Sequence, residues 1–260
     1  MPQWDADQYL RFAEERTRPC RDLVARIDVS FPRRMIDLGC GPGNSTQVLS
    51  QRWPAAELTG LDSSEEMVQA ARRDHSQWES RVGDISSWAS SPGEPFDIVF
   101  SNAALQWVPD HGALFPSLLS RVAVGGALAV QVPCNLEAPA HVIARRLAAR
   151  EDWRPLFPPD GVREWHVHDA DFYYDRLAPG AQRVDFWTTE YLHVMPGVES
   201  VVEWYKGTGL RPYHQALASP ADQERFLQEY RDGLREAYSL RADGSLLFPF
   251  QRLFMIAYRK

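Results

Sequence analysis

Three glycines separated by single residues follow a short apolar segment that contains a carboxylate, Asp37. Glycine lets a turn close tightly and brings bare backbone close to a ligand. A helix after such a turn points its free N–H groups at the same ligand. The spacing therefore predicts a strand over 34–38, a ligand-binding turn, and a helix with Asn44 or Ser45 as its N-cap. The three glycines are Gly39, Gly41 and Gly43.

Two classes of ligand use such a turn. Dinucleotide enzymes have the pattern G-x-G-x-x-G, whose third glycine would fall at Asn44. In this chain the third glycine comes one position earlier, and Asp37 precedes the first glycine by two positions. A carboxylate there suits a ligand with a cationic group and repels a pyrophosphate. The stretch DLGCGPGNST resembles the first motif of class I S-adenosylmethionine (SAM) methyltransferases, and a Rossmann dehydrogenase is the alternative.

A second carboxylate, Asp62, ends the apolar segment 57–61. It lies about 20 residues past the glycines, where an acidic group meets ribose hydroxyls in nucleotide-binding α/β folds. Ser63 and Glu66 have the spacing of a capping box for the next helix, which leaves Asp62 for the ribose. Met67, one turn into this helix, lies either against a base or in the core.

Further polar residues follow later strands. Segments 80–82 and 96–100 are the third and fourth expected strands, Asn102 comes shortly after the fourth, and 127–132 is the fifth. In the methyltransferase resemblance, Asp84 accepts a hydrogen bond from the adenine amino group and Ile85 packs on the ring. Alternating strands and helices predict a parallel sheet with its ligand at the carboxyl ends. The expected fold is α/β: a Rossmann-like class I methyltransferase sheet of seven strands, mostly parallel, with N-terminal helices and a largely helical insertion or lid.

Composition argues against several classes of protein. The 260 residues carry a net charge of −7, which disfavours binding to nucleic acid or an anionic membrane. Three cysteines without C-x-x-C spacing predict neither disulfides nor a zinc site. His166 and His168 lack further ligands at a recognised spacing, so we expect no metal. With no signal peptide and no apolar run of about 18 residues, the expected location is the cytoplasm.

The patterns divide the chain into four parts. Residues 1–33 form N-terminal cap helices, with Pro19 as the first residue of the second helix. Residues 34–132 form the SAM-binding core, 133–245 the substrate wall or lid with late core elements, and 246–260 the final core strand. Within the third part we expect helices over 138–150, 169–177, 196–206 and 220–238, and a strand over 184–194.

The resemblance extends beyond the core. Nearly the whole chain is similar to the trans-aconitate 2-methyltransferase family, in the stretches QYLRFAEERTRPCRDLVARI, SNAALQWVPDH, EWYKGTGLRPY and FPFQRLFMIAYRK. The resemblance implies transfer of a methyl group from SAM to a carboxylate of trans-aconitate, which gives the monomethyl ester and S-adenosylhomocysteine (SAH). It also implies that an arginine of ERTRP, Arg16 or else Arg18, holds the SAM carboxylate. The candidate cofactor residues are Arg16, Asp37, Gly39, Gly41, Gly43, Asp62, Ser63, Met67, Asp84, Ile85 and Asn102.

Such a reaction needs positioning more than acid–base chemistry. A carboxylate is already ionised at pH 7, so we expect no catalytic base. The remaining carboxylates of the substrate need cationic partners, for which the arginine fork is well suited. Arg211, in a glycine-rich stretch that we read as a loop, is the first candidate, whereas Lys206 is equally well explained as a solvated helix-end charge. The candidate substrate residues are Tyr9, Gln106, Trp107, Lys206, Arg211, Tyr213 and Arg252.

Two alternatives remain open at this stage. One is a SAM methyltransferase that acts on another small carboxylic acid or on a small-molecule oxygen nucleophile. The other is a protein that binds SAM without catalysis.

Overall fold

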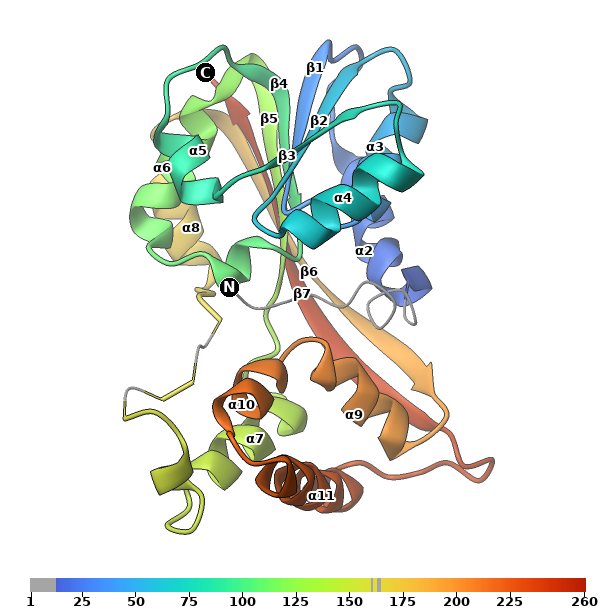
Figure 1. The fold of residues 1–260 in the computed structure, drawn as a ribbon. Coiled ribbons are helices and arrows are strands. Elements are labelled where there is room, and N and C mark those ends of the chain that lie inside the picture. Colours follow the sequence, from blue (N-terminus) through green and yellow to red (C-terminus); the bar gives the residue numbers. More distant parts are fainter. Residues whose placement is uncertain (1–12, 160, 163–164) are drawn as a thin grey trace. The chain divides into compact units, whose positions relative to one another are not determined.

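A seven-stranded sheet organises the computed structural model, which describes residues 13–159, 161–162 and 165–260. The strand order is β3-β2-β1-β4-β5-β7-β6 (Figure 1). Neighbours from β3 to β5 pair in parallel, and β7 runs antiparallel to β5. The expected α/β fold is confirmed. The strands are β1 (Arg34–Leu38), β2 (Glu57–Asp62), β3 (Glu79–Val82), β4 (Phe96–Asn102), β5 (Val122–Pro133), β6 (Ala181–Met195) and β7 (Leu246–Arg259).

The chain divides into two compact units. Unit 1 comprises Met1–Cys134, Trp165–Thr189 and Arg252–Lys260, and unit 2 comprises Asn135–Glu164 and Glu190–Gln251. Unit 1 thus holds β1 to β5 with the end of β7, and it contains the glycine turn. The four-part division expected from the sequence stays a prediction.

Helices cover both faces of the sheet in unit 1 (Figure 1). Along β1, Asp37 faces the side of α3, whereas Ile36 and Leu38 belong to the core cluster beneath α6 and α8. The first face carries α2 (Ala13–Arg26), α3 (Asn44–Arg52) and α4 (Glu65–Asp74). The second carries α5 (Ile85–Ser90), α6 (His111–Ser120) and α8 (Ala170–Leu177), and the short 3-10 helix η1 (Leu105–Trp107) follows β4.

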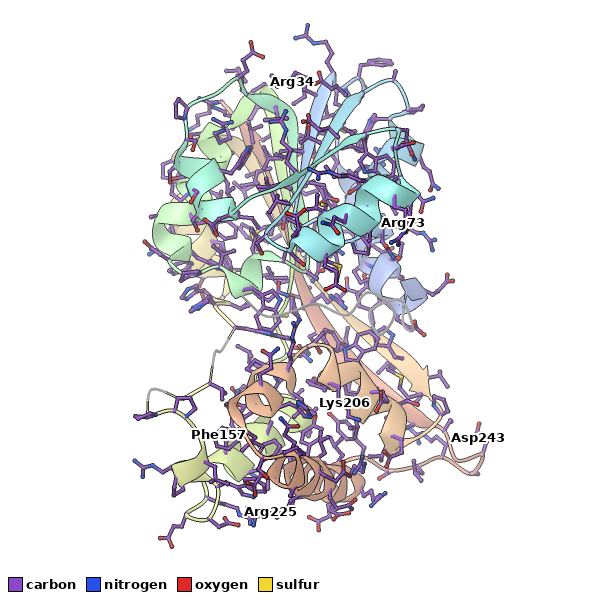
Figure 2. The ribbon with its side chains drawn as sticks, in the orientation of Figure 1. Arg34, Arg73, Phe157, Lys206, Arg225 and Asp243 are labelled. Carbon is purple, nitrogen blue, oxygen red and sulfur yellow. The ribbon has the colours of Figure 1, made fainter. Side chains whose placement is uncertain are left out.

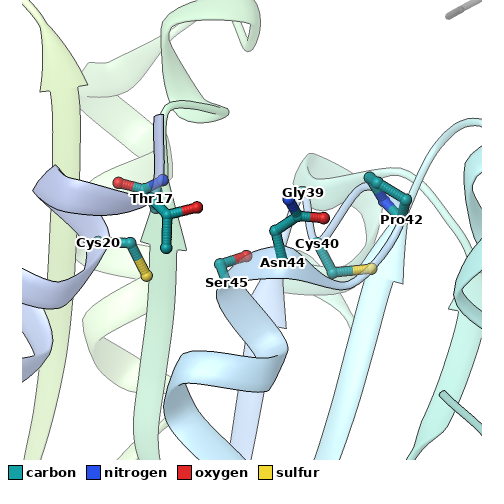
Figure 3. A pocket seen from close by; sticks show the side chains of 8 residues that line it. Thr17, Cys20, Gly39, Cys40, Pro42, Asn44 and Ser45 are labelled. Atoms are coloured by element: carbon teal, nitrogen blue, oxygen red, sulfur yellow. The ribbon is translucent and has the colours of Figure 1, made fainter. Parts of the chain in front are cut away.

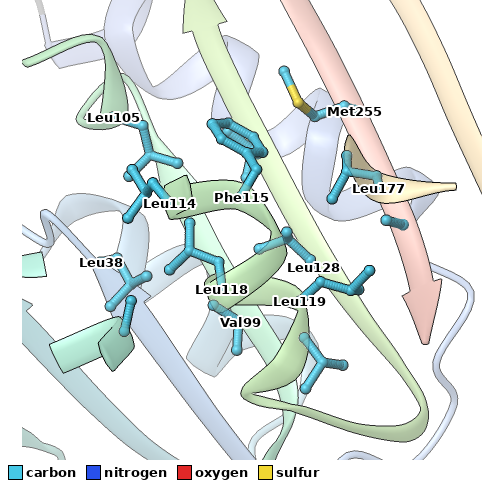
Figure 4. Close-up of a cluster of buried hydrophobic side chains, with 14 of the residues drawn as sticks. Leu38, Val99, Leu105, Leu114, Phe115, Leu118, Leu119, Leu128, Leu177 and Met255 are labelled. Carbon is cyan, nitrogen blue, oxygen red and sulfur yellow. The ribbon is translucent and has the colours of Figure 1, made fainter. Parts of the chain in front are cut away.

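The core on the second face consists mainly of buried aliphatic side chains, with Phe115 among them (Figure 4). Phe115 and Leu118 of α6 are fully buried, as is Leu177 of α8. They pack over the strands of the sheet, where Leu128 and Met255 are also buried. This packing holds the carboxyl ends of β1, β4 and β5 in fixed positions relative to one another, which is what a ligand site at this edge requires.

Unit 2 is built around aromatic rings (Figure 2). Phe226 stacks on Tyr213 with ring centroids 5.8 Å apart and meets Trp153 edge-on at 5.1 Å. Phe157 adds edge-on contacts to both Tyr213 and Phe226, and Arg225 lies over Trp153. Its helices are α7 (Pro139–Ala149), η2 (Arg154–Leu156), α9 (Val198–Lys206), α10 (Arg211–Ala216) and α11 (Pro220–Ala237).

The prediction that Pro19 begins a separate helix is wrong. One helix, α2, runs through Pro19 to Arg26. Proline removes one backbone hydrogen bond inside a helix, but the residues that follow it, Cys20 and Leu23, are almost fully buried. That burial offsets the lost bond. The stretch around Tyr9, where we expected the first helix, lies outside the described residues.

Candidate functional site

The three glycines of the turn all have positive φ, at 74°, 55° and 104°. Gly39 is packed from behind, since a Cβ on it would lie 2.1 Å from the Cβ of Ala104. Its N–H donates to the carbonyl of Leu61 at 2.7 Å, which joins the turn to β2. Around Gly41, by contrast, no described atom beyond those of Gly41 and its two chain neighbours lies within 4 Å of the position of a Cβ. The turn is therefore held on one side and open at Gly41, as a ligand-binding backbone requires.

Asp37 is buried beneath the first turn of α3. Its Oδ2 accepts hydrogen bonds from the hydroxyls of Ser45 at 2.6 Å and Thr46 at 2.7 Å. Burial raises the pKa of Asp37 to about 6, although both hydroxyls oppose the rise. The predicted N-cap at Asn44 or Ser45 is wrong: Gly43 takes that position without a side-chain cap, because the Ser45 hydroxyl turns back to Asp37.

Asp62 ties the glycine turn to the end of β2. One carboxylate oxygen accepts from the N–H of Gly41 and the other from the N–H of Ser64, both at 2.9 Å. Burial raises the pKa of Asp62, and these backbone N–H groups counteract part of the rise. The predicted capping box of Ser63 and Glu66 is wrong. Ser64 is the N-cap of α4 and accepts from the N–H of Met67, because helix and strand meet one residue later than expected.

A pocket opens beside the turn in unit 1 (Figure 3). From α2 it is lined by Thr17 and Cys20, and from β4 by Asn102. The Oδ1 atom of Asn102 is buried and has no hydrogen-bond partner among the described residues. An acceptor left in that state needs a donor, which a ligand in the pocket can supply. The turn contributes Gly39, Cys40, Pro42, Asn44 and Ser45.

The backbone after Asn102 is strained. Ala103 has a φ of 55°, which is rare for a residue with a Cβ. Its N–H donates to the carbonyl of Gln131, and its own carbonyl accepts from the side-chain amide of Gln106 at 2.7 Å. Such strain is characteristic of functional sites. Gln106 and Trp107 lie in η1, which begins shortly after Asn102, the last residue of β4.

The other cofactor candidates of unit 1 lie in the segments that follow β2 and β3, and in α2. Asp84 caps α5 by accepting from the N–H of Ser87 at 2.8 Å, and Ile85 begins that helix with its side chain buried. Met67 is 3% exposed, which favours the core interpretation over contact with a base. Ser63 is exposed. Arg16 lies in α2 one residue before the pocket-lining Thr17, and its role stays a prediction, as does that of the exposed Arg18.

Three substrate candidates lie in unit 2. Lys206 ends α9 and its ammonium pairs with Glu203 at 2.8 Å, so the helix-end interpretation accounts for it. The ring of Tyr213 belongs to the aromatic core. Arg211 is not in a loop, as we expected, but is the first residue of α10. Pro212 fits the next position because the first N–H groups of a helix have no internal partner. Tyr9, another substrate candidate, lies outside the described residues.

Arg252, the last substrate candidate, belongs to unit 1. Its side chain is buried, and one guanidinium N–H donates to Oε1 of Gln131 at 3.2 Å. In the ladder between β5 and β7, Arg252 lies opposite Pro133. The sequence identified Arg252 as a candidate but not its partner Gln131, because the two residues are 121 positions apart.

One buried histidine was missed by sequence reasoning. His111 Nε2 bonds to the carbonyl of Leu105 at 2.9 Å, and Nδ1 bonds to the hydroxyl of Tyr173 at 2.8 Å. Burial lowers the pKa of His111, which favours the neutral ring. The two bonds join η1 to α8. His168 stacks on Phe172 at 3.8 Å instead of facing a ligand set. Among the described residues, no group of three or more His, Cys, Asp or Glu side chains could hold a metal ion.

The arrangement gives unit 1 a glycine turn that is open at Gly41, two carboxylates and an amide at the carboxyl ends of adjacent parallel strands. This is the location at which open α/β sheets bind their ligands. None of the helices in the described part of the chain has the length and apolar character needed to cross a membrane.

Solved structures with a related fold include methyltransferases. The YcgJ protein from Bacillus subtilis covers 94% of this chain and 99% of its own, with a TM-score of 0.58 and 16% identity. Geranyl diphosphate methyltransferase, solved in complex with SAM, covers 94% of this chain and 85% of its own, with a TM-score of 0.52 and 16% identity. These likenesses concern the fold.

Sequence comparison reaches further. Residues 35–126 match the family model described as a methyltransferase domain. The trans-aconitate 2-methyltransferase of Azoarcus sp. (strain BH72) is 45% identical, with 100% of both chains covered. The protein of the same name from Yersinia pestis (strain Pestoides F) is 44% identical, with 99% of both chains covered. With this identity over its full length, the chain belongs to the trans-aconitate 2-methyltransferase family.

Proposed function

We propose that the protein transfers the methyl group of SAM to a carboxylate of trans-aconitate, with the monomethyl ester and SAH as products. The observation that carries the proposal is the turn at Gly39–Gly43, whose backbone is open at Gly41 and lies beside the orphan acceptor of Asn102. The full-length identity to proteins named for this reaction supports the choice of substrate.

The residues around the turn fit a cofactor with a nucleoside and a cationic centre. Asp62 already accepts two backbone N–H groups, and a carboxylate has room for about four hydrogen bonds, so ribose hydroxyls can add to them. Asn102 offers a buried acceptor, and Asp37 offers a nearby buried carboxylate. When bound, SAM supplies an activated methyl group on a sulfonium. These assignments, and those of Arg16, Asp84 and Ile85, are proposals.

On the substrate side, the chain's task is to hold ionised carboxylates without a catalytic base. The nucleophile is already a carboxylate at pH 7, so orientation and exclusion of water provide the acceleration. Arg252 is a buried cation that a carboxylate can pair with bidentately. The role of Arg211, a residue of unit 2, in binding a substrate carboxylate stays a prediction. We assign Gln106 and Trp107 the task of shaping the pocket beside the cofactor.

The test is an assay of methyl transfer from labelled SAM across di- and tricarboxylates. We expect trans-aconitate to have the highest kcat/KM in the panel. Transfer to a different acid with higher kcat/KM would reassign the substrate. SAH binding without transfer to any acid would identify a protein that binds SAM without catalysis. A thermal shift with NAD and none with SAH would support a dehydrogenase instead. The cytoplasmic location, and the absence of nucleic-acid or membrane partners, stay predictions.

A further inference from the structure

Three polar side chains lie in a row across neighbouring strands of unit 1. Asn102 on β4 is opposite Gln131 on β5, and Arg252 on β7 is opposite Pro133, two residues beyond Gln131. Residues two apart on a strand share a face of the sheet. Asn102, Gln131 and Arg252 are therefore on one face, the same face as Asp37, which is opposite Phe100. The residues that alternate with them along these strands, such as Val130 and Leu253, lie on the second face and belong to its core.

Gln131 is fully buried, and its hydrogen bonding determines how its amide is oriented. Arginine is purely a donor, so the 3.2 Å bond from Arg252 must end on the carbonyl oxygen, Oε1. The amide nitrogen, Nε2, is then the other end of the group. Nε2 is buried and has no hydrogen-bond partner among the described residues. A buried N–H donor without an acceptor is unfavourable and indicates a missing partner.

We propose that Gln131 and Arg252 together form a subsite for a substrate carboxylate that is not methylated. This inference rests on the proposed function and adds a residue, Gln131, that has two tasks. Its carbonyl holds the guanidinium of Arg252 in place, and its amide N–H donates to the same carboxylate as the guanidinium. A carboxylate accepts up to about four hydrogen bonds, so it can accept from the amide and the guanidinium at the same time. Asn102, next in the row, lines the cofactor pocket, which places the subsite next to the methyl donor.

Three analogues of trans-aconitate each lack one carboxylate: glutaconate, mesaconate and itaconate. The experiment measures kcat/KM for trans-aconitate and the inhibition constant of each analogue against it, in the wild-type protein, Gln131→Met and Gln131→Glu. Methionine keeps the length of the side chain and removes the amide, whereas glutamate places a charge that repels the substrate and pairs with Arg252. Gln251→Met is the matched control, because Gln251 precedes Arg252 on β7 and is exposed, with its amide on Glu190.

We expect kcat/KM for trans-aconitate to fall by tenfold or more in Gln131→Met, through KM, and by more in Gln131→Glu. One of the three analogues should bind Gln131→Met and the wild type equally well, because it lacks the carboxylate that the subsite holds. The affinity for SAH, measured by calorimetry, should stay within twofold. Gln251→Met should behave as the wild type throughout.

Several results would overturn the inference. An equal loss for trans-aconitate and all three analogues would mean that Gln131 only supports the fold. A tenfold weaker affinity for SAH would assign the pair to the carboxylate of the cofactor. Unchanged kinetics in both variants would remove Gln131 from the site. If the wild type methylates none of these acids, the proposed function fails. In that case, calorimetric binding of trans-aconitate to the SAH complex of wild type and Gln131→Met decides the subsite by itself.

Discussion

Replacing single glycines by alanine compares the open position of the turn, Gly41, with Gly39, which lines the pocket but is packed against Ala104. Gly41→Ala adds a methyl group at a φ of 55°, with no described atom within 4 Å. The positive φ should cost about 1–2 kcal/mol of stability. The methyl group then occupies the space in which we place the cofactor, so the dissociation constant of SAH should rise by at least tenfold, equivalent to about 1.4 kcal/mol.

Gly125 provides a matched control for the backbone strain. It has a φ of 79°, and a Cβ on it also meets nothing within 4 Å. It lies in the first part of β5, before the residues that pair with the end of β4. Gly125→Ala should therefore show a similar loss of stability with an unchanged affinity for SAH.

Gly39→Ala should lose more stability than Gly41→Ala. Its new Cβ would lie 2.1 Å from that of Ala104, and the clash adds to the strain of a positive φ. We expect a loss of about 2–5 kcal/mol in the free energy of unfolding. The assays are urea denaturation and calorimetry with SAH for all three variants. An affinity for SAH within twofold of the wild type in Gly41→Ala would refute the placement of the cofactor at the open face of the turn.

Three further predictions concern charge and metal. Because burial raises the pKa of Asp37 to about 6, its ionisation destabilises the folded state as the pH rises through that value. Asp37→Asn should therefore have a higher melting temperature than the wild type at pH 8, and this difference should disappear towards pH 4. A difference in melting temperature that does not change with pH would contradict this. Arg211→Ala should lower kcat/KM for trans-aconitate by an amount equivalent to about 2–5 kcal/mol, with partial recovery in Arg211→Lys and unchanged binding of SAH. Turnover within about threefold of the wild type would exclude this role for Arg211. Activity should be complete in EDTA, and a loss restored by one divalent ion would show that a metal takes part.

The framework of the site could be predicted because its signals are local. Strands β1 and β4 were identified from short apolar runs, and the positive φ values of the turn follow from its glycine spacing. The seven-strand sheet then follows from the alternation of strands and helices together with the family resemblance. Asp62 and Asn102 were found because each lies where an apolar segment ends, and in the structure each is the last residue of its strand.

Side-chain partners could not be predicted, since they depend on contacts that sequence spacing does not encode. From the sequence, the hydroxyl of Ser45 could either cap its own helix or bond to Asp37. In the folded chain it donates to Asp37. His111 and Tyr173 are 62 residues apart and meet through the packing of α6 against α8. Arg211 was read as a loop residue because the glycines before it obscure a helix of only six residues.

The most direct test of the account is the initial rate of methyl transfer from labelled SAM to trans-aconitate, with mesaconate, itaconate and glutaconate measured beside it. We expect a monomethyl ester of trans-aconitate and SAH in equal amounts, and a kcat/KM for trans-aconitate above that for each analogue. Equal rates for the tricarboxylate and the three dicarboxylates would contradict a site built to hold more than one carboxylate. Binding of SAH without any ester would contradict the reaction itself.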